Sequence, residues 1–348
     1  MTPERLEEIL ARFGELRIGV LGDFFLDAYL EVDPELAEPS VETGKVAHQV
    51  VATRSYAGAA GTIVNNLSAL GVGRVWALGA LGDDGPGWEL RRALKRVGCN
   101  TDLLLSTDER MTPVYLKPHD RHVTGLAGEH SRYDTRNRTP TSDRVVREVL
   151  AAAEQVMPEL DALIVLDQVE HSENEIVTPD VRVWVSTQAA RKPGPIVWVD
   201  SRFHVRSFPG AWIKPNQFES CGERPTGPES RVETQRVVEQ LPALRAAQGA
   251  PVTVTLGERG LIVSDPQPTW LPAYGVTGPI DTTGAGDSVT AAMVAGLCAK
   301  ASHREAGWLG NLAASLTIQQ LGTTGVATPR ELLARLGQWR DERPSDFA

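Results

Sequence analysis

The glycine-rich segment Asp281–Asp287 carries the clearest chemical signal in this sequence. It reads Asp-Thr-Thr-Gly-Ala-Gly-Asp and runs into an apolar, small-residue segment, 288–299, which we expect to be a buried helix. Free N–H groups and the helix dipole make such a helix start an anion-binding site, and Gly284 and Gly286 let a phosphate approach the backbone. Asp287 falls in the first turn, where its carboxylate can accept a proton from an attacking hydroxyl. The N–H groups expected to hold the transferring charge belong to Ala285, Gly286 and Asp287.

The length of this segment decides between two interpretations of it. A lone Gly-Ala-Gly-Asp is equally compatible with a plain helix cap, whereas seven residues leading into a long small-residue helix favour an anion site. The sequence contains no Gly-x-x-x-x-Gly-Lys-Ser/Thr loop and no Gly-x-Gly-x-x-Gly turn after a strand. A P-loop kinase and a dinucleotide-binding site are therefore disfavoured.

Polar residues follow several of the predicted strands. Asp23 and Asp27 come after the apolar run 17–21, where they could accept sugar hydroxyls or simply close a turn. Asn216 and Glu219 could hold a hydrated Mg²⁺, which needs few protein ligands, or lie in a solvated loop. The turn Gly257–Gly260 follows a strand too, but Gly-x-x-Gly turns are common and the signal is weak.

The remaining clusters of polar residues have simpler interpretations. His119, His122 and His130 lie close together in the sequence, and a solvent-facing loop is favoured over a metal site because no fourth ligand is suggested by the spacing. Arg132 and Asp134 either reach a substrate or form a surface ion pair that contributes little.

The elements that position these residues alternate between strand and helix, which is typical of a doubly wound parallel α/β sheet. Strands are predicted at 17–21, 75–78, 162–166, 196–199, 212–213 and 252–256, and helices at 88–97, 143–156, 180–191, 230–248 and 288–299. Two segments, 28–57 and 110–135, alternate polar and apolar residues and predict a small β-sheet flap. We expect one domain over 1–348, with a frayed charged tail at 341–348.

Composition narrows the class of protein. The 348 residues carry 35 basic and 45 acidic side chains, giving a net charge of −10, and 41% of the residues are hydrophobic. This balance argues against nonspecific nucleic-acid binding, and no apolar run is long enough to span a membrane. The three cysteines form no CxxC pair and no signal peptide is visible, so we expect a reducing, cytoplasmic location.

Taken in order along the chain, these motifs resemble the PfkB, or ribokinase-like, carbohydrate kinases over nearly the whole length. The resemblance implies a three-layer α/β/α sandwich with a flap, ATP and Mg²⁺ as cofactors with a monovalent cation in some cases, and a homodimer formed through the flap. It places substrate contacts at Asp23, Asp27, Gly58, Ala59, Gly61, Asn65 and Asp281. It places nucleotide contacts at Lys214, Asn216, Thr255, Gly257, Gly260 and Asn311, and magnesium near Asn216 and Glu219.

Within this family the sequence is most similar to bacterial heptose-phosphate kinases, from which it also departs. The usual Gly-Gly-Ala-Ala-Asn turn has Ala57 at its first position and Gly61 in place of the asparagine that contacts the sugar. The segment 167–171 lacks the usual aromatic residue and glycine. We therefore expect an ATP-dependent kinase of a sugar or sugar phosphate. The alternatives are a kinase of a nucleoside, sugar acid or vitamin precursor, and a non-catalytic relative that binds nucleotide or sugar.

Overall fold

The centre of the molecule is a sheet of six parallel strands, seen in a computed structural model that describes residues 1–123, 125–168, 172–227 and 230–347. Its order is β10-β9-β8-β1-β4-β5, and the strands are almost wholly buried, as expected when helices cover both faces. The strands are β1 (Arg17–Gly22), β4 (Arg74–Gly82), β5 (Leu104–Thr107), β8 (Ala162–Asp167), β9 (Ile196–Ser201) and β10 (Trp212–Ile213). The predicted α/β class is confirmed.

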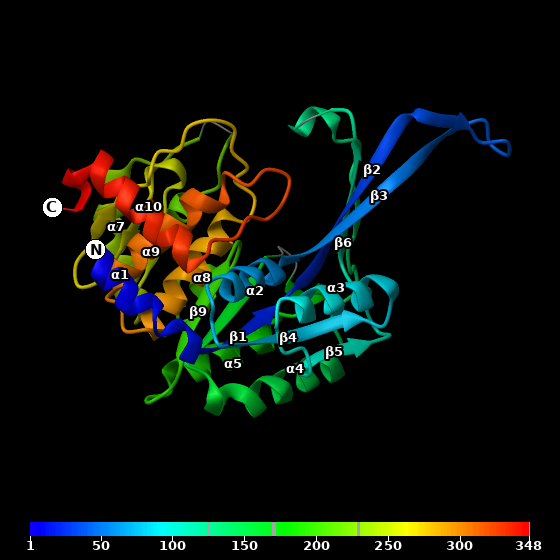
Figure 1. Ribbon diagram of the computed structural model, residues 1–348. Helices are drawn as coiled ribbons and strands as arrows, with labels where there is room; N and C mark the ends of the chain where they lie inside the picture. Colours follow the sequence, from blue (N-terminus) through cyan, green and yellow to red (C-terminus); the bar gives the residue numbers. More distant parts are fainter. Residues whose placement is uncertain (124, 169–171, 228–229, 348) are drawn as a thin grey trace.

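Helices form a layer on each face of this sheet, and each layer has its own apolar core (Figure 1). One layer contains α1 (Pro3–Leu10), α2 (Ala60–Ala69), α3 (Gly85–Arg96), α8 (Ala285–Cys298), α9 (His303–Thr317) and α10 (Pro329–Glu342). The other contains α4 (Asp143–Val156), α5 (Pro179–Ala190) and α7 (Thr234–Gln248), with the short α6 (Gln217–Cys221) beside it. No helix in the described part of the chain has the length and apolar character needed to cross a bilayer.

One predicted strand belongs to a different sheet. The segment expected at 252–256 forms β11 (Thr253–Thr255), which pairs antiparallel with β12 (Leu261–Val263), and β12 pairs with β13 (Thr269–Leu271). Two isolated parallel bridges, one of which joins Ile213 to Val252, connect β11 to the end of the main sheet. The strand is too short for a full parallel ladder, because the turn that starts at Gly257 ends it after three residues.

A separate four-stranded sheet, which we call the flap, projects away from the body (Figure 1). Its strands are β2 (Phe24–Pro39), β3 (Val46–Ala59), β6 (Val114–Asp120) and β7 (Tyr133–Thr135), in the order β3-β2-β6-β7. The long β2–β3 hairpin is antiparallel, β6 runs parallel to β2, and β7 is antiparallel to β6. The predicted second sheet is thus present, and its first strand begins at residue 24, before the expected boundary at 28.

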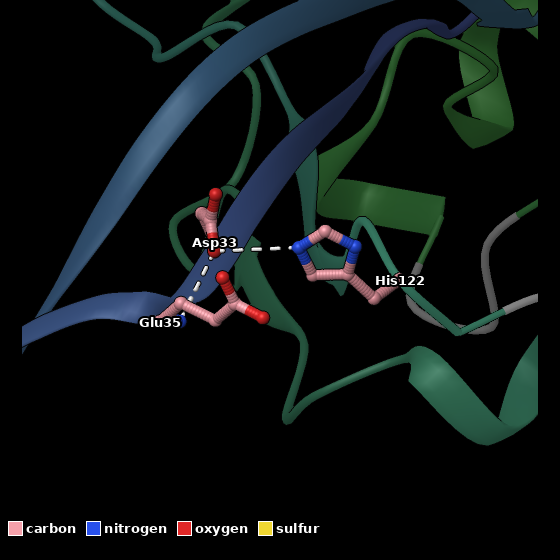
Figure 2. Close-up of side chains that lie close together, drawn as sticks. All are labelled: Asp33, Glu35 and His122. Atoms are coloured by element: carbon pink, nitrogen blue, oxygen red, sulfur yellow. Dashed lines mark hydrogen bonds and ion pairs between the residues drawn. The ribbon is translucent and has the colours of Figure 1, made fainter.

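His122 lies beside two carboxylates on the flap, Asp33 and Glu35 (Figure 2). One potential ligand atom from each residue falls within 4.8 Å of the others. Asp33 already binds Arg121 at 3.1 Å through Oδ2, and its Oδ1 accepts the Glu35 N–H at 3.0 Å. Both oxygens of the buried Asp33 carboxylate therefore already have partners within the chain. We interpret the cluster as a set of contacts that stabilises the bend in β2.

Residues 341–347 of the C-terminal tail are packed against the body, contrary to the expectation of a frayed end at 341–348, of which residue 348 lies outside the described part. α10 extends to Glu342, and residues 344–347 form a single 3₁₀ turn. The Phe347 ring packs 4.7 Å from the Trp308 ring, measured between centroids, and Trp339 Nε1 donates to Asp346 Oδ2 at 2.8 Å. Although the tail is rich in charged residues, it contains one aromatic residue, Phe347. Packing of the Phe347 ring holds the turn against α9 and α10.

Candidate active site

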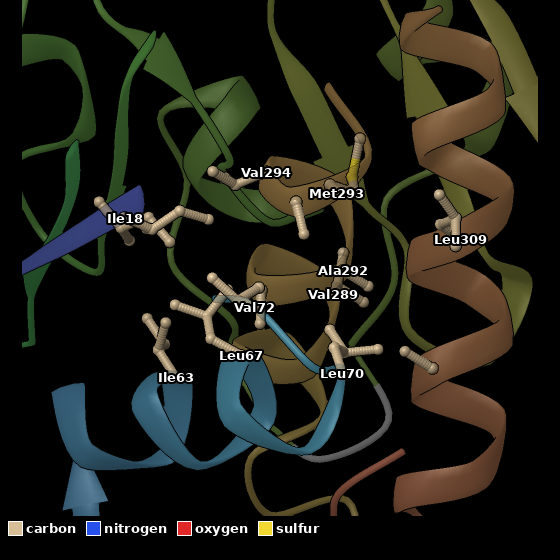
Figure 3. Packing of buried hydrophobic residues seen from close by; sticks show 14 of the residues in the cluster. Ile18, Ile63, Leu67, Leu70, Val72, Val289, Ala292, Met293, Val294 and Leu309 are labelled. Atoms are coloured by element: carbon tan, nitrogen blue, oxygen red, sulfur yellow. The ribbon is translucent and has the colours of Figure 1, made fainter. Parts of the chain in front are cut away.

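The starts of α2 and α8 meet at the carboxyl edge of the central sheet. Ile63 and Leu67 of α2 pack against Val289 and Ala292 of α8 in the buried core (Figure 3). Gly284, which precedes α8, has φ 77° and lies so close to α2 that a Cβ there would be 3.1 Å from Thr62 Cγ2. Two glycine-containing turns more than 200 positions apart are thereby brought to one site.

The start of α8, where an anion-binding site is predicted, is open and has no side-chain cap. The helix begins at Ala285, and Gly284 caps it in the left-handed conformation without a side-chain cap. Ala285 N–H donates to the Thr282 carbonyl at 3.2 Å. Within the described residues, the N–H groups of Gly286 and Asp287 have no acceptor. The prediction that Ala285 contributes its N–H is therefore corrected, because the turn into the helix already uses it.

A buried ion pair lies against this helix start. Lys214 Nζ is 2.9 Å from Asp200 Oδ2, and Thr290 Oγ1 donates to the same oxygen at 3.1 Å. A Cβ at Gly286 would lie 3.5 Å from Lys214 Nζ, so the ammonium group borders the anion site. Burial lowers the pKa of Lys214, but the carboxylates of Asp200, Asp287 and Glu219 together outweigh this effect and the pKa is raised. Lys214 therefore stays charged beside the N–H groups.

Asp287 is a half-buried carboxylate whose pKa is raised to near neutral pH. Burial raises this pKa most and Asp200 raises it further, while Lys214 and Arg202 lower it, so that the pKa of Asp287 is about 7. Asp27 of the flap also contributes to the rise, which shows that it lies within electrostatic range. A carboxylate of this kind is a well-matched proton acceptor near neutral pH.

Asn216 and Glu219 form a capping box at the start of α6. Asn216 Oδ1 accepts the N–H groups of Phe218 and Glu219, and Glu219 Oε2 accepts the Asn216 N–H at 2.8 Å. The Asn216 oxygen is fully used, so it does not fit a Mg²⁺ ligand. Each Glu219 oxygen accepts one bond and keeps further capacity, so Glu219 fits a role as a ligand of magnesium-bound water. Burial raises the pKa of Glu219 to about 7.

On the flap side, Asp27 is held by a lysine that sequence reasoning missed. Lys117 Nζ is 3.1 Å from Asp27 Oδ1 and 3.2 Å from the Tyr29 hydroxyl, and it lies 4.8 Å from the Tyr29 ring centroid. A Cβ at Gly58 would overlap the Asp27 carboxylate, so glycine is required there. Gly58 therefore acts by making room for Asp27.

Two arginines continue this polar face of the flap. Asp27 pairs with Tyr115 across β2 and β6, and Tyr115 pairs with Asp134 across β6 and β7, so the three side chains share one face. Arg132 binds Asp134 at 2.7 Å, and Arg136 binds it at 3.2 Å. Both guanidinium groups also lie over the Tyr115 ring. The predicted Arg132–Asp134 pair is present, and Arg136 joins it.

Asp23 lies in the interior, which corrects its predicted contact with a sugar. It is 1% exposed, and its Oδ1 accepts the Ile176 N–H at 2.9 Å. Arg110 and Glu175 are its charged neighbours, and Arg110 binds Glu175 at 3.3 Å. Burial and the Asp23 charge raise the pKa of Glu175, which favours its protonated form. The strand end points Asp23 inward, toward the loop that contains Glu175, whose Ile176 N–H it accepts.

The glycine turn before α2 is shaped mainly by packing. Ala59, at φ 52°, ends β3 and precedes the helix. A Cβ at Gly61 would collide with the Ala57 side chain, so Gly61 is a buried packing position and its predicted sugar contact is corrected. Asn65 Nδ2 faces the Ala57 carbonyl at 3.5 Å and supports the turn from behind. The compact turn explains why asparagine is absent at position 61.

Of the predicted nucleotide contacts, the turn after β11 is accessible and Asn311 is not. Gly257 is exposed and has φ 63°. Gly260 is buried, and it packs so closely against the chain that a Cβ there would overlap the Leu271 carbonyl. Asn311 is 5% exposed, and its Nδ2 donates to the Leu271 and Pro272 carbonyls. Asn311 thus fastens α9 to the end of β13, which corrects its predicted contact with a nucleotide.

Thr255 and Asp281 are the two remaining predicted positions. Thr255, at the end of β11, is half-buried and bridges in parallel to Asn216. Asp281 Oδ1 accepts the Thr283 N–H at 2.9 Å and closes the turn that leads into α8. Asp167 binds Ser201 and Arg182, while positions 169–171 of the segment discussed above lie outside the described residues.

Curated relatives resemble the chain over nearly its full length. It is 25% identical to the bifunctional protein HldE of Trichlorobacter lovleyi, covering 99% of this chain and 67% of that protein. It is 30% identical to the bifunctional protein HldE of Caulobacter sp. strain K31, covering 95% of this chain and 64% of that protein. The chain thus spans about two thirds of the length of these relatives.

Solved structures share the fold. Phosphofructokinase-2 from Escherichia coli, in complex with substrates and products, superposes with a TM-score of 0.69 at 20% identity, covering 93% of this chain and 99% of that one. Ribokinase from Arabidopsis thaliana, complexed with ribose and ATP, gives a TM-score of 0.66 at 19% identity, covering 92% and 98%. The model of the pfkB family of carbohydrate kinases matches residues 211–330, which include Lys214 and the start of α8. The chain is therefore similar to the pfkB family of carbohydrate kinases, which are ATP-dependent phosphotransferases.

Proposed function

We propose that this protein transfers the γ-phosphoryl group of ATP to a hydroxyl of a sugar phosphate of the heptose 7-phosphate type. The observation that carries the proposal is the start of α8. There, two unpaired N–H groups, the Lys214 ammonium group and a carboxylate with a pKa of about 7 converge. Phosphoryl transfer needs this combination of positioning, positive potential and a proton acceptor.

In the proposed mechanism Asp287 accepts the proton of the attacking hydroxyl. The N–H groups of Gly286 and Asp287, with Lys214, hold the charge of the transferring group. Magnesium, when bound with ATP, neutralises phosphate charge, and Glu219 is the residue suited to hold its water shell. The exposed turn at Gly257, next to Thr255, is the proposed site of the nucleotide phosphates.

The flap supports an acceptor that carries its own negative charge. Asp27 offers a carboxylate to sugar hydroxyls, and Lys117 pairs with that carboxylate at 3.1 Å. Arg132 and Arg136 share the single carboxylate of Asp134, which leaves one positive charge in excess on the same face. This charge favours a sugar phosphate over a neutral nucleoside or vitamin precursor.

The remaining features of the proposal follow from the family. Cysteines 99, 221 and 298 are unpaired, and ATP as donor is consistent with the cytoplasm. Phosphofructokinase-2 from Escherichia coli has been solved in complex with potassium, which supports a monovalent cation here as well. A homodimer formed through the flap is supported by the exposed edge strand β3.

The test is phosphoryl transfer from ATP·Mg²⁺ to a panel that includes heptose 7-phosphate, heptose, fructose 6-phosphate and adenosine. Transfer to the phosphorylated sugars is expected, and Asp287→Asn should lower kcat by about 10²- to 10⁴-fold while ATP binding persists. Asp143→Asn, an exposed aspartate on α4, is the matched control. Wild-type kcat in Asp287→Asn would remove Asp287 from the mechanism, and preferential transfer to adenosine would refute a sugar phosphate acceptor.

A further inference from the structure

The outer face of α3 is a cationic and aromatic surface that the proposed reaction does not use. Trp88 is 64% exposed, and the Arg92 guanidinium lies 4.7 Å from its ring centroid. Arg92, Lys95 and Arg96 make no ion pair within the described residues. Together with Arg91, these side chains line a surface hollow of about 350 Å³. Because the protein has a net charge of −10, unpaired cations gathered on one helix call for an acidic partner.

The tip of the flap, residues 34–46, has the complementary character. Glu35, Glu38 and Glu42 are exposed there, against the single cation of Lys45. Apolar side chains stand between the acids, and the exposed ones are Leu36, Val41 and Val46. The tip reaches far from the body of its own chain (Figure 1). Exposed apolar groups rimmed by charge mark an interaction surface.

The edge of the flap shows how two copies can bring these surfaces together. β3 lies at the end of the sheet order, so its outer N–H and C=O groups are available to another strand. α3 packs against the base of β2 and β3, at the opposite end of the hairpin from the tip. Two flaps placed side by side in antiparallel orientation would set each tip beside the other's base. Two-fold symmetry then forms the contact twice.

We infer that the flap tip of one copy docks on α3 of a second copy, with the three glutamates facing Arg92, Lys95 and Arg96. Trp88 and Leu36 provide the apolar centre of this contact. The inference rests on the homodimer in the proposed function and goes further, because it names both contacting surfaces and their charges. α3 is thereby assigned as the receiving surface.

The test is a charge exchange between the two surfaces, read out as the dimer dissociation constant by sedimentation at low salt. The triple variant R92E/K95E/R96E and the triple variant E35K/E38K/E42K should each weaken the dimer by about 100-fold, since six pairs become repulsive in a symmetric dimer. The combination of all six substitutions should restore the affinity. R147E/R304E/R330E, which reverses three exposed cations on α4, α9 and α10, is the control for R92E/K95E/R96E, with an equal change in net charge.

The outcomes separate the parts of the proposal. Mutual rescue by the combined variant, with an unchanged control, supports docking between the tip and α3. A dimer that withstands both triple variants, or one that the combined variant fails to restore, overturns the docking and leaves the flap dimer in place. A wild-type protein that stays monomeric at all concentrations overturns both the docking and the dimer. Kinase activity, assayed separately on the same samples, shows whether the proposed function itself fails.

Discussion

The start of α8 and the polar face of the flap both present charged side chains toward the proposed acceptor site, but in opposite ways. Beside α8, the buried side chains of Lys214 and Asp200 form an ion pair at 2.9 Å, and the Thr290 hydroxyl donates a hydrogen bond to the same Asp200 oxygen. On the flap, Arg132 and Arg136 are 44% and 47% exposed and share one carboxylate. Buried pairs have a single geometry, because breaking them leaves an uncompensated charge. Exposed pairs rearrange at little cost.

This difference suggests a division of labour within the proposed reaction. The rigid helix start suits the transferring phosphoryl group, whose position is the same for every acceptor. The adaptable flap suits the part of the acceptor that distinguishes one sugar from another. The comparison therefore predicts effects on kcat at α8 and effects on KM at the flap.

Of the two lysine variants that test this comparison, Lys214→Met has the larger expected effect. Loss of the ammonium group beside the anion site should lower kcat by about 10²- to 10³-fold, with a small change in acceptor KM. Asp200 is left buried without its partner, so the free energy of unfolding should fall by about 3–5 kcal/mol. The double variant Asp200→Asn/Lys214→Met removes that unpaired charge and serves as the control for stability. An unchanged kcat in a folded Lys214→Met enzyme would contradict the prediction that the α8 residues act on kcat.

On the flap, Lys117→Met should act mainly on acceptor binding. It removes a charge-assisted hydrogen bond and the cation beside Asp27, so the KM for heptose 7-phosphate should rise by about 10- to 100-fold. The KM for ATP should stay the same, because Lys117 lies on β6, away from the exposed turn at Gly257. Lys117→Arg keeps the charge and should retain most of the affinity. A loss confined to kcat would place Lys117 with the α8 residues instead.

The dependence of kcat/KM on pH should reflect the ionisation of Asp287 at α8 and not the Lys117 cation on the flap. The pKa of Asp287 in the free protein is about 7, and only its ionised form can accept the proton. kcat/KM should therefore fall about tenfold per pH unit below that value and level off above it. Asp287→Asn should lose this limb, and Lys117→Met should keep it. A flat profile between pH 5 and 8 would contradict the assignment of Asp287 as base.

The smallest effect concerns stability and Glu175, which is buried beside Asp23 at the base of the flap. The pKa of Glu175 is raised in the folded protein, so between its ordinary value and the raised one the folded state holds a proton that the unfolded state has lost. The free energy of unfolding must then fall as pH rises, by up to about 1.4 kcal/mol per unit for this group. Glu175→Gln should reduce the slope between pH 5 and 8 in urea unfolding. An unaltered slope would show that Glu175 ionises normally.

The two regions also differ in how well the sequence predicts them. The α8 site is one continuous segment, 281–287, and helix starts follow local rules, so both the anion site and the base could be proposed directly. For the flap, the sequence predicts a sheet, Asp27 and the Arg132–Asp134 pair, but not the contacts that connect these residues across the strands. Tyr29 and Lys117 are 88 positions apart, and nothing local sets the register that makes them neighbours. Arg136 and Tyr115 were missed for the same reason.

Burial accounts for the predictions that needed correction. Asp23, Gly61 and Asn311 have residue types that suit ligand contacts, but the structure turns all three inward. A residue type shows which bonds a side chain can form, whereas packing decides whether its partner is a ligand or the chain itself. Asn311 bonds two backbone carbonyls for this reason.

Asp84 links α3 to the flap through one carboxylate. Its Oδ1 accepts the Gly87 N–H at the start of α3, and its Oδ2 accepts the Thr112 N–H just before β6 enters the flap. Thr112 Oγ1 in turn accepts the Gly82 N–H, which makes the junction a stiff pivot. A displacement of α3 would therefore also displace the segment at Thr112 that leads into β6 of the same chain. If α3 receives the flap of a second copy, closure over one acceptor becomes mechanically coupled to closure over the other.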